Sequence, residues 1–153
     1  MRNGAIDCLT DADLNFSPGG ENLRLGQLIV ELGEIQFGYI VSLETLKHDW
    51  SYKNSEEGLA TSVNQLQVWF AALDVRMKTV LNTLSDADLG KEIDRSNGIF
   101  RTVEEQLEIY CETMLIFLGK LVIYFKAMEK PLPPSIQHYI AWAYTSAWPD
   151  HFL

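Results

Sequence analysis

The sequence is poor in cysteine, in basic residues and in long apolar runs. Its two cysteines, Cys8 and Cys111, do not suggest a disulfide framework, and a reducing cytoplasm is the expected setting. Only 12 lysines and arginines stand against 21 aspartates and glutamates, which gives a formal net charge of −9. Because such a surface repels phosphate backbones and anionic headgroups, we expect neither nucleic acid nor a membrane as a partner.

No segment is long and apolar enough to span a bilayer. The most apolar stretch, residues 114–125, is interrupted by Lys120 and falls well short of the roughly 20 residues that a span requires. The first residues carry one arginine and soon become acidic, unlike a secretory signal peptide. With 153 residues, 47% of them hydrophobic, the chain is predicted to form one domain over residues 1–153 with its own core.

Three long segments repeat apolar residues at alternating steps of three and four, the spacing that places one stripe along a helix. Helices are therefore predicted from Leu25 to about Leu46, from Val63 to about Leu84 and from Val103 to about Met128. Only a bundle buries three such stripes against one another. The predicted fold class is all-α: an up-down four-helix bundle with three long helices, a short first helix near residues 1–9 and an extra C-terminal helix.

Polar residues near the expected helix starts predict the caps. Asn22 and Ser55 are expected to cap the first two long helices, and Thr102 with Glu105 is expected to form a capping box for the third. The proline-rich stretch 131–134 ends the third helix, since proline has no N–H to donate.

A six-residue pattern occurs twice: residues 9–14 read LTDADL and residues 84–89 read LSDADL. One interpretation is that Ser/Thr-Asp-x-Asp suits helix ends and turns wherever they occur. The other is that the chain contains two related helical halves. Under both interpretations the carboxylates lie in loops and satisfy turns.

The C-terminal segment 135–153 is rich in large aromatic rings, and a helix is predicted over about residues 135–147. The rings belong to Tyr139, Trp142, Tyr144, Trp148 and Phe152. Because the first helix has only two to three turns, part of the three long stripes needs another cover. Three explanations remain open: this segment packs on the bundle, a second copy of the chain covers the stripes, or part of the first helix is missing from this chain.

The order of these elements resembles the DinB-like family of four-helix bundles, also described as DNA-damage-inducible or YfiT-like. The start of the first long helix, RLGQLIVEL at residues 24–32, is similar to the family segment SIGELLxHL. Within the third long helix, TMLIFLGK at residues 113–120 corresponds to the family segment HxxxHRGQ and matches it at Gly119. The resemblance extends over about residues 5–134.

Members of this family bind a divalent metal with three histidines, one from the first of these helices and two from the last. At the matching positions this chain has Glu31, Thr113 and Phe117. A carboxylate ligates metal, a threonine hydroxyl does so weakly, and a phenyl ring has no donor atom. Phe117 also belongs to the apolar stripe, so its ring is expected to fill the place of the ion. The resemblance therefore implies a site without metal, in which these three residues line a ligand pocket.

Other carboxylates and histidines offer weaker metal-ligating alternatives. Glu108 and Glu112 recur at helical spacing, but no histidine follows either by three residues as in carboxylate-bridged di-metal bundles. We interpret them as a solvated flank. The histidines are His48, His138 and His151. Each is interpreted as an isolated surface or capping residue, and Cys111 as a small apolar side chain.

Glu31 has two open interpretations. If it points inward, a bare carboxylate among leucines needs a partner, and Thr113 is the candidate across the helices. If the helix is rolled slightly, Glu31 reaches solvent instead. We expect the substitution Glu31→Gln to be tolerated or mildly stabilising.

These observations predict a DinB-like protein that has lost the family metal site, needs no cofactor, and works as a homodimeric small-ligand-binding or interaction module. The alternative is a metal-dependent enzyme of the DinB-like thiol-transferase type, with zinc or nickel held by substitute ligands around Glu31. No glycine-rich phosphate loop, nucleophile elbow or Cys-x-x-Cys motif supports another chemistry.

Overall fold

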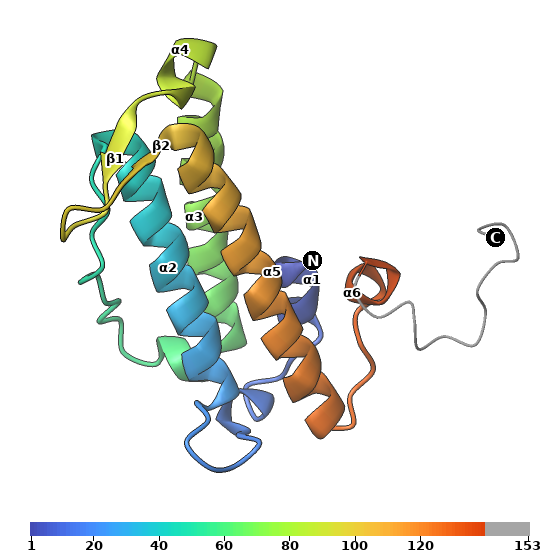
Figure 1. The fold of residues 1–153 in the computed structure, drawn as a ribbon. Helices are drawn as coiled ribbons and strands as arrows, with labels where there is room; N and C mark the ends of the chain where they lie inside the picture. The colour runs from blue at the N-terminus through green and yellow to red at the C-terminus, as the bar shows by residue number, and fades with distance from the viewer. Residues whose placement is uncertain (140–153) are drawn as a thin grey trace, which may run out of the picture.

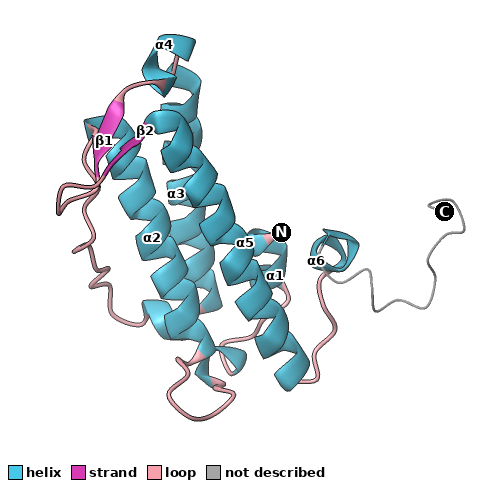
Figure 2. Ribbon diagram, in the orientation of Figure 1, coloured by secondary structure: helices cyan, strands magenta, loops and turns pink. Residues whose placement is uncertain are grey.

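The computed structural model describes residues 1–139, and these form a helical bundle (Figure 1). Three long helices lie side by side: α2 (Leu25–Thr45), α3 (Val63–Thr83) and α5 (Val103–Ala127). The short α1 (Arg2–Asp7) packs against α3, and α6 (Pro134–Tyr139) follows α5 (Figure 2). The prediction of an all-α fold with three long helices, a short first helix and a further helix after them is confirmed. No helix within residues 1–139 combines the length and hydrophobicity needed to cross a membrane.

Smaller elements occupy the connections between these helices. Short 3₁₀ turns at Asp13–Asn15 and Leu59–Thr61 lie near the start of α2, and the one-turn helix α4 (Asp86–Leu89) follows α3. Strands β1 (Glu92–Asp94) and β2 (Phe100–Thr102) form an antiparallel hairpin that leads directly into α5. Ile93 of β1 is fully buried, so the hairpin closes one end of the bundle.

The apolar stripes of the long helices face one another, as their spacing requires. The largest fully buried side chains on these helices are Leu25, Ile29, Leu32, Ile40, Leu66, Phe70, Leu121 and Phe125. Burying one such side chain is worth roughly 1.5–3 kcal/mol. Within the described residues the buried polar side chains are Gln36, Ser42, His48 and Gln106. In an interior this apolar, each of these polar groups needs a hydrogen-bond partner.

The start of α5 confirms the predicted capping box. The N–H of Glu105 donates to the Thr102 hydroxyl at 3.2 Å, and the N–H of Thr102 donates to the Glu105 carboxylate at 2.8 Å. The helix ends at Ala127, shortly before the prolines, as predicted.

The caps predicted for the first two long helices are wrong. At the start of α2, the Gln27 side chain accepts a backbone N–H one turn before it at 3.0 Å, while Asn22 donates to the Gly19 carbonyl. At the start of α3 the cap is Ser62, and Ser55 lies in the preceding loop. These connections contain several turn-forming residues, and the packing of the helices decides which of them becomes the cap.

The repeated LTDADL and LSDADL patterns form the same local turn twice. Asp13 accepts from the N–H and the hydroxyl of Thr10, both at 2.7 Å. Asp88 accepts from the N–H of Ser85 at 2.8 Å and from its hydroxyl at 2.6 Å. Each aspartate also forms an ion pair with a lysine. The carboxylates therefore satisfy turns, as both interpretations of the pattern require.

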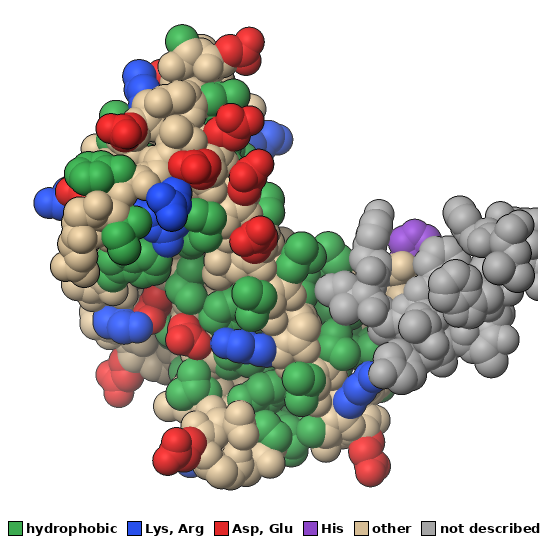
Figure 3. All heavy atoms as spheres, viewed as in Figure 1, with side chains coloured by type: hydrophobic (Ala, Val, Ile, Leu, Met, Phe, Trp, Pro, Cys, Tyr) green, Lys and Arg blue, Asp and Glu red, His purple; other side chains and the backbone are tan. Residues whose placement is uncertain are grey.

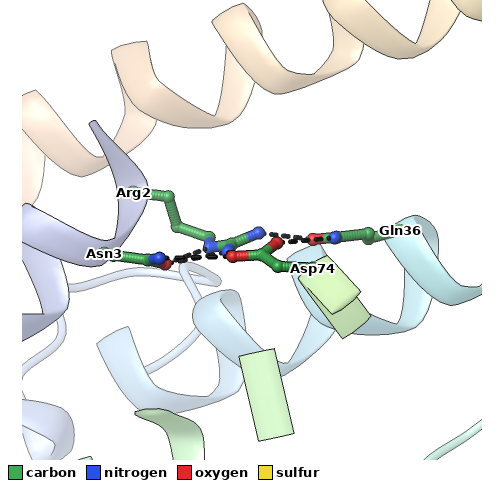
Figure 4. Close-up of polar contacts among 4 residues, drawn as sticks. All are labelled: Arg2, Asn3, Gln36 and Asp74. Atoms are coloured by element: carbon green, nitrogen blue, oxygen red, sulfur yellow. Dashed lines mark hydrogen bonds and ion pairs between the residues drawn. The ribbon is translucent and has the colours of Figure 1, made fainter. Parts of the chain in front are cut away.

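A polar cluster fastens the short first helix to the bundle (Figure 4). Arg2 on α1 donates to Asp74 on α3 at 2.5 Å and to Gln36 on α2, and Gln36 donates to Asp74 at 3.1 Å. Asn3 adds a bond to Asp74 at 3.2 Å. Burial acts to raise the pKa of Asp74, but the hydrogen bonds from Arg2 and Gln36 outweigh it and lower that pKa below its ordinary value.

The described part of the C-terminal segment packs on the bundle beside α1. A Cβ atom on Gly4 would lie 3.2 Å from the Ser135 hydroxyl, and Ile136 is fully buried. The expectation for the large rings at positions 142, 144, 148 and 152 falls outside the described residues.

Candidate functional site

His48 lies in the loop after α2, and only 2% of its surface is exposed. Two backbone hydrogen bonds join this loop to β1: the N–H of His48 donates to Asp94 at 2.8 Å, and the N–H of Asp94 donates to Leu46 at 2.9 Å. Leu46 adopts a left-handed φ of 58°, which turns the chain out of the helix. The prediction that His48 is an isolated surface or capping histidine is therefore wrong, because the loop and hairpin enclose it.

A buried amide, that of Gln106 on α5, fixes the orientation of the His48 ring. Arg95 donates to the Gln106 Oε1 atom at 2.8 Å, and because a guanidinium only donates, this contact orients the amide. The Gln106 Nε2 group then donates to the Ser42 hydroxyl at 2.8 Å and to the His48 Nδ1 atom at 2.9 Å. Since Nδ1 accepts, the proton of the neutral ring is on Nε2.

His48 is held in its neutral form. The pKa of His48 is lowered from its ordinary value of 6.5 to about 4, first by burial and then by the positive charge of Arg95, while the charge of Asp49 partly opposes both. The geometry acts in the same direction, because a proton added at Nδ1 would face the N–H of Gln106. At neutral pH the ring therefore offers one donor, Nε2–H.

Aromatic side chains complete the surroundings of the His48 ring. Trp50 lies 3.8 Å from it between centroids, and the edge of Tyr39 approaches at 5.0 Å. The Trp50 indole donates to the Arg95 carbonyl at 3.1 Å, and the Arg95 guanidinium lies 5.1 Å from the Trp50 ring centroid. These contacts leave the ring little freedom to rotate.

The Nε2 side of His48 faces a cavity of about 240 Å³ beside α2. A Cβ atom on Gly38 would lie 3.2 Å from Nε2, so the missing side chain of this glycine keeps the donor accessible. Nε2 has no hydrogen-bond partner among the described residues. The cavity is lined by Glu31, Glu34, Ile35, Gly38, His48, Asp49, Trp50, Tyr52 and Lys53. Two of the residues singled out by sequence, Glu31 and His48, thus meet at one cavity.

Two of the four charged residues that line this cavity, Glu34 and Lys53, form an ion pair. Glu34 accepts from the Lys53 ammonium at 2.7 Å and from the N–H of Asn54 at 3.0 Å. Asp49 accepts from the N–H and hydroxyl of Ser51, which lower the pKa of Asp49 below its ordinary value. Glu31 is half-buried and forms no hydrogen bond or ion pair with the described residues. Its carboxylate is therefore available to a ligand, as is the Oδ2 atom of Asp49, since both Ser51 hydrogen bonds end on Oδ1.

Two neighbouring cavities share these residues. One of about 530 Å³ lies where His48, Trp50 and Ser96 meet, and another of about 370 Å³ is lined by Glu31, Lys120 and residues near the start of α2. We place the candidate site at the 240 Å³ cavity because there the Nε2 donor and the unpaired carboxylate occur together.

Comparison with known proteins shows which solved fold this chain shares. No protein-family profile and no curated protein matches the sequence. Among solved structures, the chain is similar to the crystal structure of YjoA, a DinB-like protein from Bacillus subtilis. The two share 15% sequence identity with a TM-score of 0.70, over 86% of this chain and 87% of that one. The chain has a DinB-like fold. The fold implied by residues 24–32 and 113–120 is thereby confirmed.

Thr113 and Phe117, which the sequence resemblance matched with Glu31 to the family metal ligands, make contacts that do not include Glu31. The Thr113 hydroxyl donates to the Ile109 carbonyl at 2.8 Å and lies 3.4 Å from the Tyr39 hydroxyl, so it is not the partner expected for Glu31. Phe117 is buried, and the Lys120 ammonium lies 4.5 Å from its ring centroid. A hydroxyl engaged with a helix carbonyl and a phenyl ring do not fit the imidazole ligands of the family.

The weaker candidates do not meet at this site. Glu108 and Glu112 are exposed on α5, in agreement with a solvated flank. Within residues 1–139, no group of three or more His, Cys, Asp or Glu side chains lies together as a metal ion requires. Cys111, interpreted from the sequence as a small apolar side chain, is exposed.

Sequence reasoning missed Gln106, Arg95 and Trp50, the residues that position His48. The one local signal was Ser42, the polar member of an otherwise apolar stripe, which is fully buried and accepts from Gln106. A buried hydroxyl in such a stripe indicates a polar partner on another element. Which residue is the partner of Ser42 depends on the packing of α2 against α5.

Proposed function

We propose that this DinB-like chain is a small-ligand-binding module that works without a metal ion. The observation that carries the proposal is the cavity beside α2, where the fixed Nε2–H of His48 and the unpaired carboxylate of Glu31 face the same space. Binding sites of small molecules combine apolar and aromatic walls with a few placed polar groups, and this cavity has that composition.

The donor chemistry of the chain supports binding without metal. The family histidines are replaced by Glu31, Thr113 and Phe117, of which only the first has a free donor atom, and Glu31 lines the cavity together with His48. A metal-dependent enzyme of the thiol-transferase type would need further ligands here, and the nearby Glu34 is already engaged with Lys53. The metal-dependent enzyme is therefore the second candidate function.

The test combines metal analysis with fragment binding. After mild dialysis, we expect the purified protein to hold far less than one equivalent of zinc or nickel. A fragment set of small amines, amides and carboxylates should shift the backbone amide signals of Gly38 and Asp49 and the indole signal of Trp50. Stoichiometric metal that is lost in Glu31→Ala would refute the proposal in favour of the enzyme.

Glycine substitutions provide a matched control for the cavity. In Gly38→Ala the added methyl group meets His48 Nε2 at 3.2 Å and the Asp49 carbonyl at 3.3 Å, whereas in Gly119→Ala it meets no atom within 4 Å. Both glycines are internal helix positions. We expect Gly38→Ala to abolish the fragment shifts and Gly119→Ala to keep them. Equal binding by the two variants would place the fragments elsewhere.

We also propose that the chain works as a homodimer, on the observation of an exposed apolar face on α5. Leu115, Ile116 and Ile123 are 56%, 61% and 60% exposed. In Figure 3 hydrophobic side chains gather over the lower half of this face, with acidic side chains above them. Clustered exposed apolar side chains mark association surfaces more often than single ones do.

Light scattering after size exclusion tests the homodimer. We expect twice the chain mass for the wild type and the chain mass for Ile116→Lys. Val68→Lys, which changes an equally exposed valine on α3, should remain a dimer. A wild type that elutes as a monomer at micromolar concentration would contradict the proposal.

A further inference from the structure

Resting on the proposed function, we propose that the ligand of the cavity beside α2 is a small organic cation that carries a hydrogen-bond acceptor at its other end. The cavity separates these two requirements in space. His48 and Glu31 both line it, and Gly38, the residue beside the His48 Nε2 atom, is seven residues from Glu31 on α2. Each of these two lining residues selects one chemical group.

The acceptor follows from the tautomer of His48. Arg95 orients the Gln106 amide, the amide donates to Nδ1, and Nε2 therefore carries the proton and donates. Although only 2% of the residue is exposed, Nε2 is not cut off from open space, so its N–H can donate into the cavity. A ligand carbonyl, ether or hydroxyl oxygen accepts the hydrogen bond from this donor. A ligand ammonium group at this position would place a second donor opposite the Nε2–H.

The cationic group follows from the balance of charges. The cavity is lined by three carboxylates, those of Glu31, Glu34 and Asp49, and by one ammonium, that of Lys53. With His48 neutral, the lining carries a net charge of −2. Lys53 neutralises Glu34, whereas the uncharged Ser51 only hydrogen-bonds Asp49, so the unmet charge belongs to Glu31 and Asp49. A ligand anion is repelled by this lining, and a cation is attracted.

The spacing along α2 sets the separation of the two groups. Gly38, beside Nε2, and Glu31 are seven residues apart on one helix, which is roughly 10 Å along its axis at 1.5 Å per residue. The stretch of α2 between them carries Ile35 and Glu34, and Glu34 forms an ion pair with Lys53. The ligand therefore has a linker several atoms long between its acceptor and its cationic group.

Matched probes test this inference. We would titrate isotope-labelled protein with three six-carbon primary amides that differ only at the far end: an ammonium, a methyl or a carboxylate group. We expect the ammonium probe to bind about tenfold more tightly than the methyl probe, as one partly buried charge pair provides. The carboxylate probe is expected to bind more weakly than both. The amide carbonyl should also shift the His48 Nε2–H signal, which a six-carbon amine without the amide should not do.

Variants separate the inference from the proposed function. Glu31→Gln should reduce the affinity for the ammonium probe to that for the methyl probe, while Glu112→Gln, at an exposed position on α5, should leave it unchanged. If the methyl or carboxylate probe binds as tightly as the ammonium probe, the inference is wrong and the proposed function stands. If none of the three shifts the cavity signals, the inference is also wrong, and the wider fragment set then decides the proposed function.

Discussion

The buried imidazole of His48 makes a quantitative prediction about stability and pH. The ring is neutral in the folded protein, with a pKa of about 4, and has the ordinary pKa of 6.5 once the chain unfolds. Because the folded-state pKa is lowered, the unfolded chain binds the proton more readily between these two values. The stability that neutral His48 contributes is therefore complete above about pH 6.5 and is lost as the pH falls towards 4.

The magnitude follows from the separation of the two pKa values. One pKa unit corresponds to about 1.4 kcal/mol, so the fall from 6.5 to about 4 corresponds to about 3 kcal/mol at its limit. Between pH 7 and pH 5 the expected loss is about 2 kcal/mol. In this window the carboxylates whose pKa is lowered, such as Asp74 and Glu44, stay ionised and contribute little to the change in the free energy of unfolding.

Urea unfolding at pH 7 and at pH 5 measures this loss. The variant is His48→Asn, whose side-chain oxygen can accept the Gln106 N–H in place of Nδ1 but does not titrate. The free energy of unfolding of the wild type should fall by about 2 kcal/mol more than that of the variant.

The result that refutes this reasoning is a common pH dependence. If the wild type and His48→Asn lose stability in parallel, His48 is solvated or charged in the folded protein. The tautomer, and with it the acceptor proposed for the ligand, would then be wrong as well.

Three further substitutions test the packing. Glu31→Gln should leave the free energy of unfolding unchanged or slightly raised in thermal melts, since the carboxylate has no described partner; a loss above about 2 kcal/mol would reveal a needed charge. Asp74→Ala should cost about 1 kcal/mol in urea unfolding, because it removes the partly exposed carboxylate that joins Arg2, Asn3 and Gln36. An unchanged midpoint would show that α1 is held otherwise. Gly119→Ala should stabilise α5 by up to about 1 kcal/mol. Gly38→Ala should be less stable than Gly119→Ala, because its methyl group meets the fixed His48 ring and the Asp49 carbonyl; the reverse order of midpoints would contradict the packing.

The sequence by itself determined the three long helices, the capping box at Thr102 and the burial of Phe117. Each of these depends on residues within a few positions of one another: apolar side chains at helical spacing, or a threonine three residues before a glutamate. The DinB-like order of elements was readable for the same reason, since periodicity and proline stops mark helices and their ends locally.

Only the tertiary structure decided the site. The bond that orients His48 comes from Gln106, 58 residues away along the chain, and the amide is itself oriented by Arg95 on the hairpin. Asn22 and Ser55 looked as suitable for capping as the residues that the packed helices use. Burial of a polar side chain, and the cavity it faces, arise where separate elements meet, and no local pattern in the chain records which elements those are.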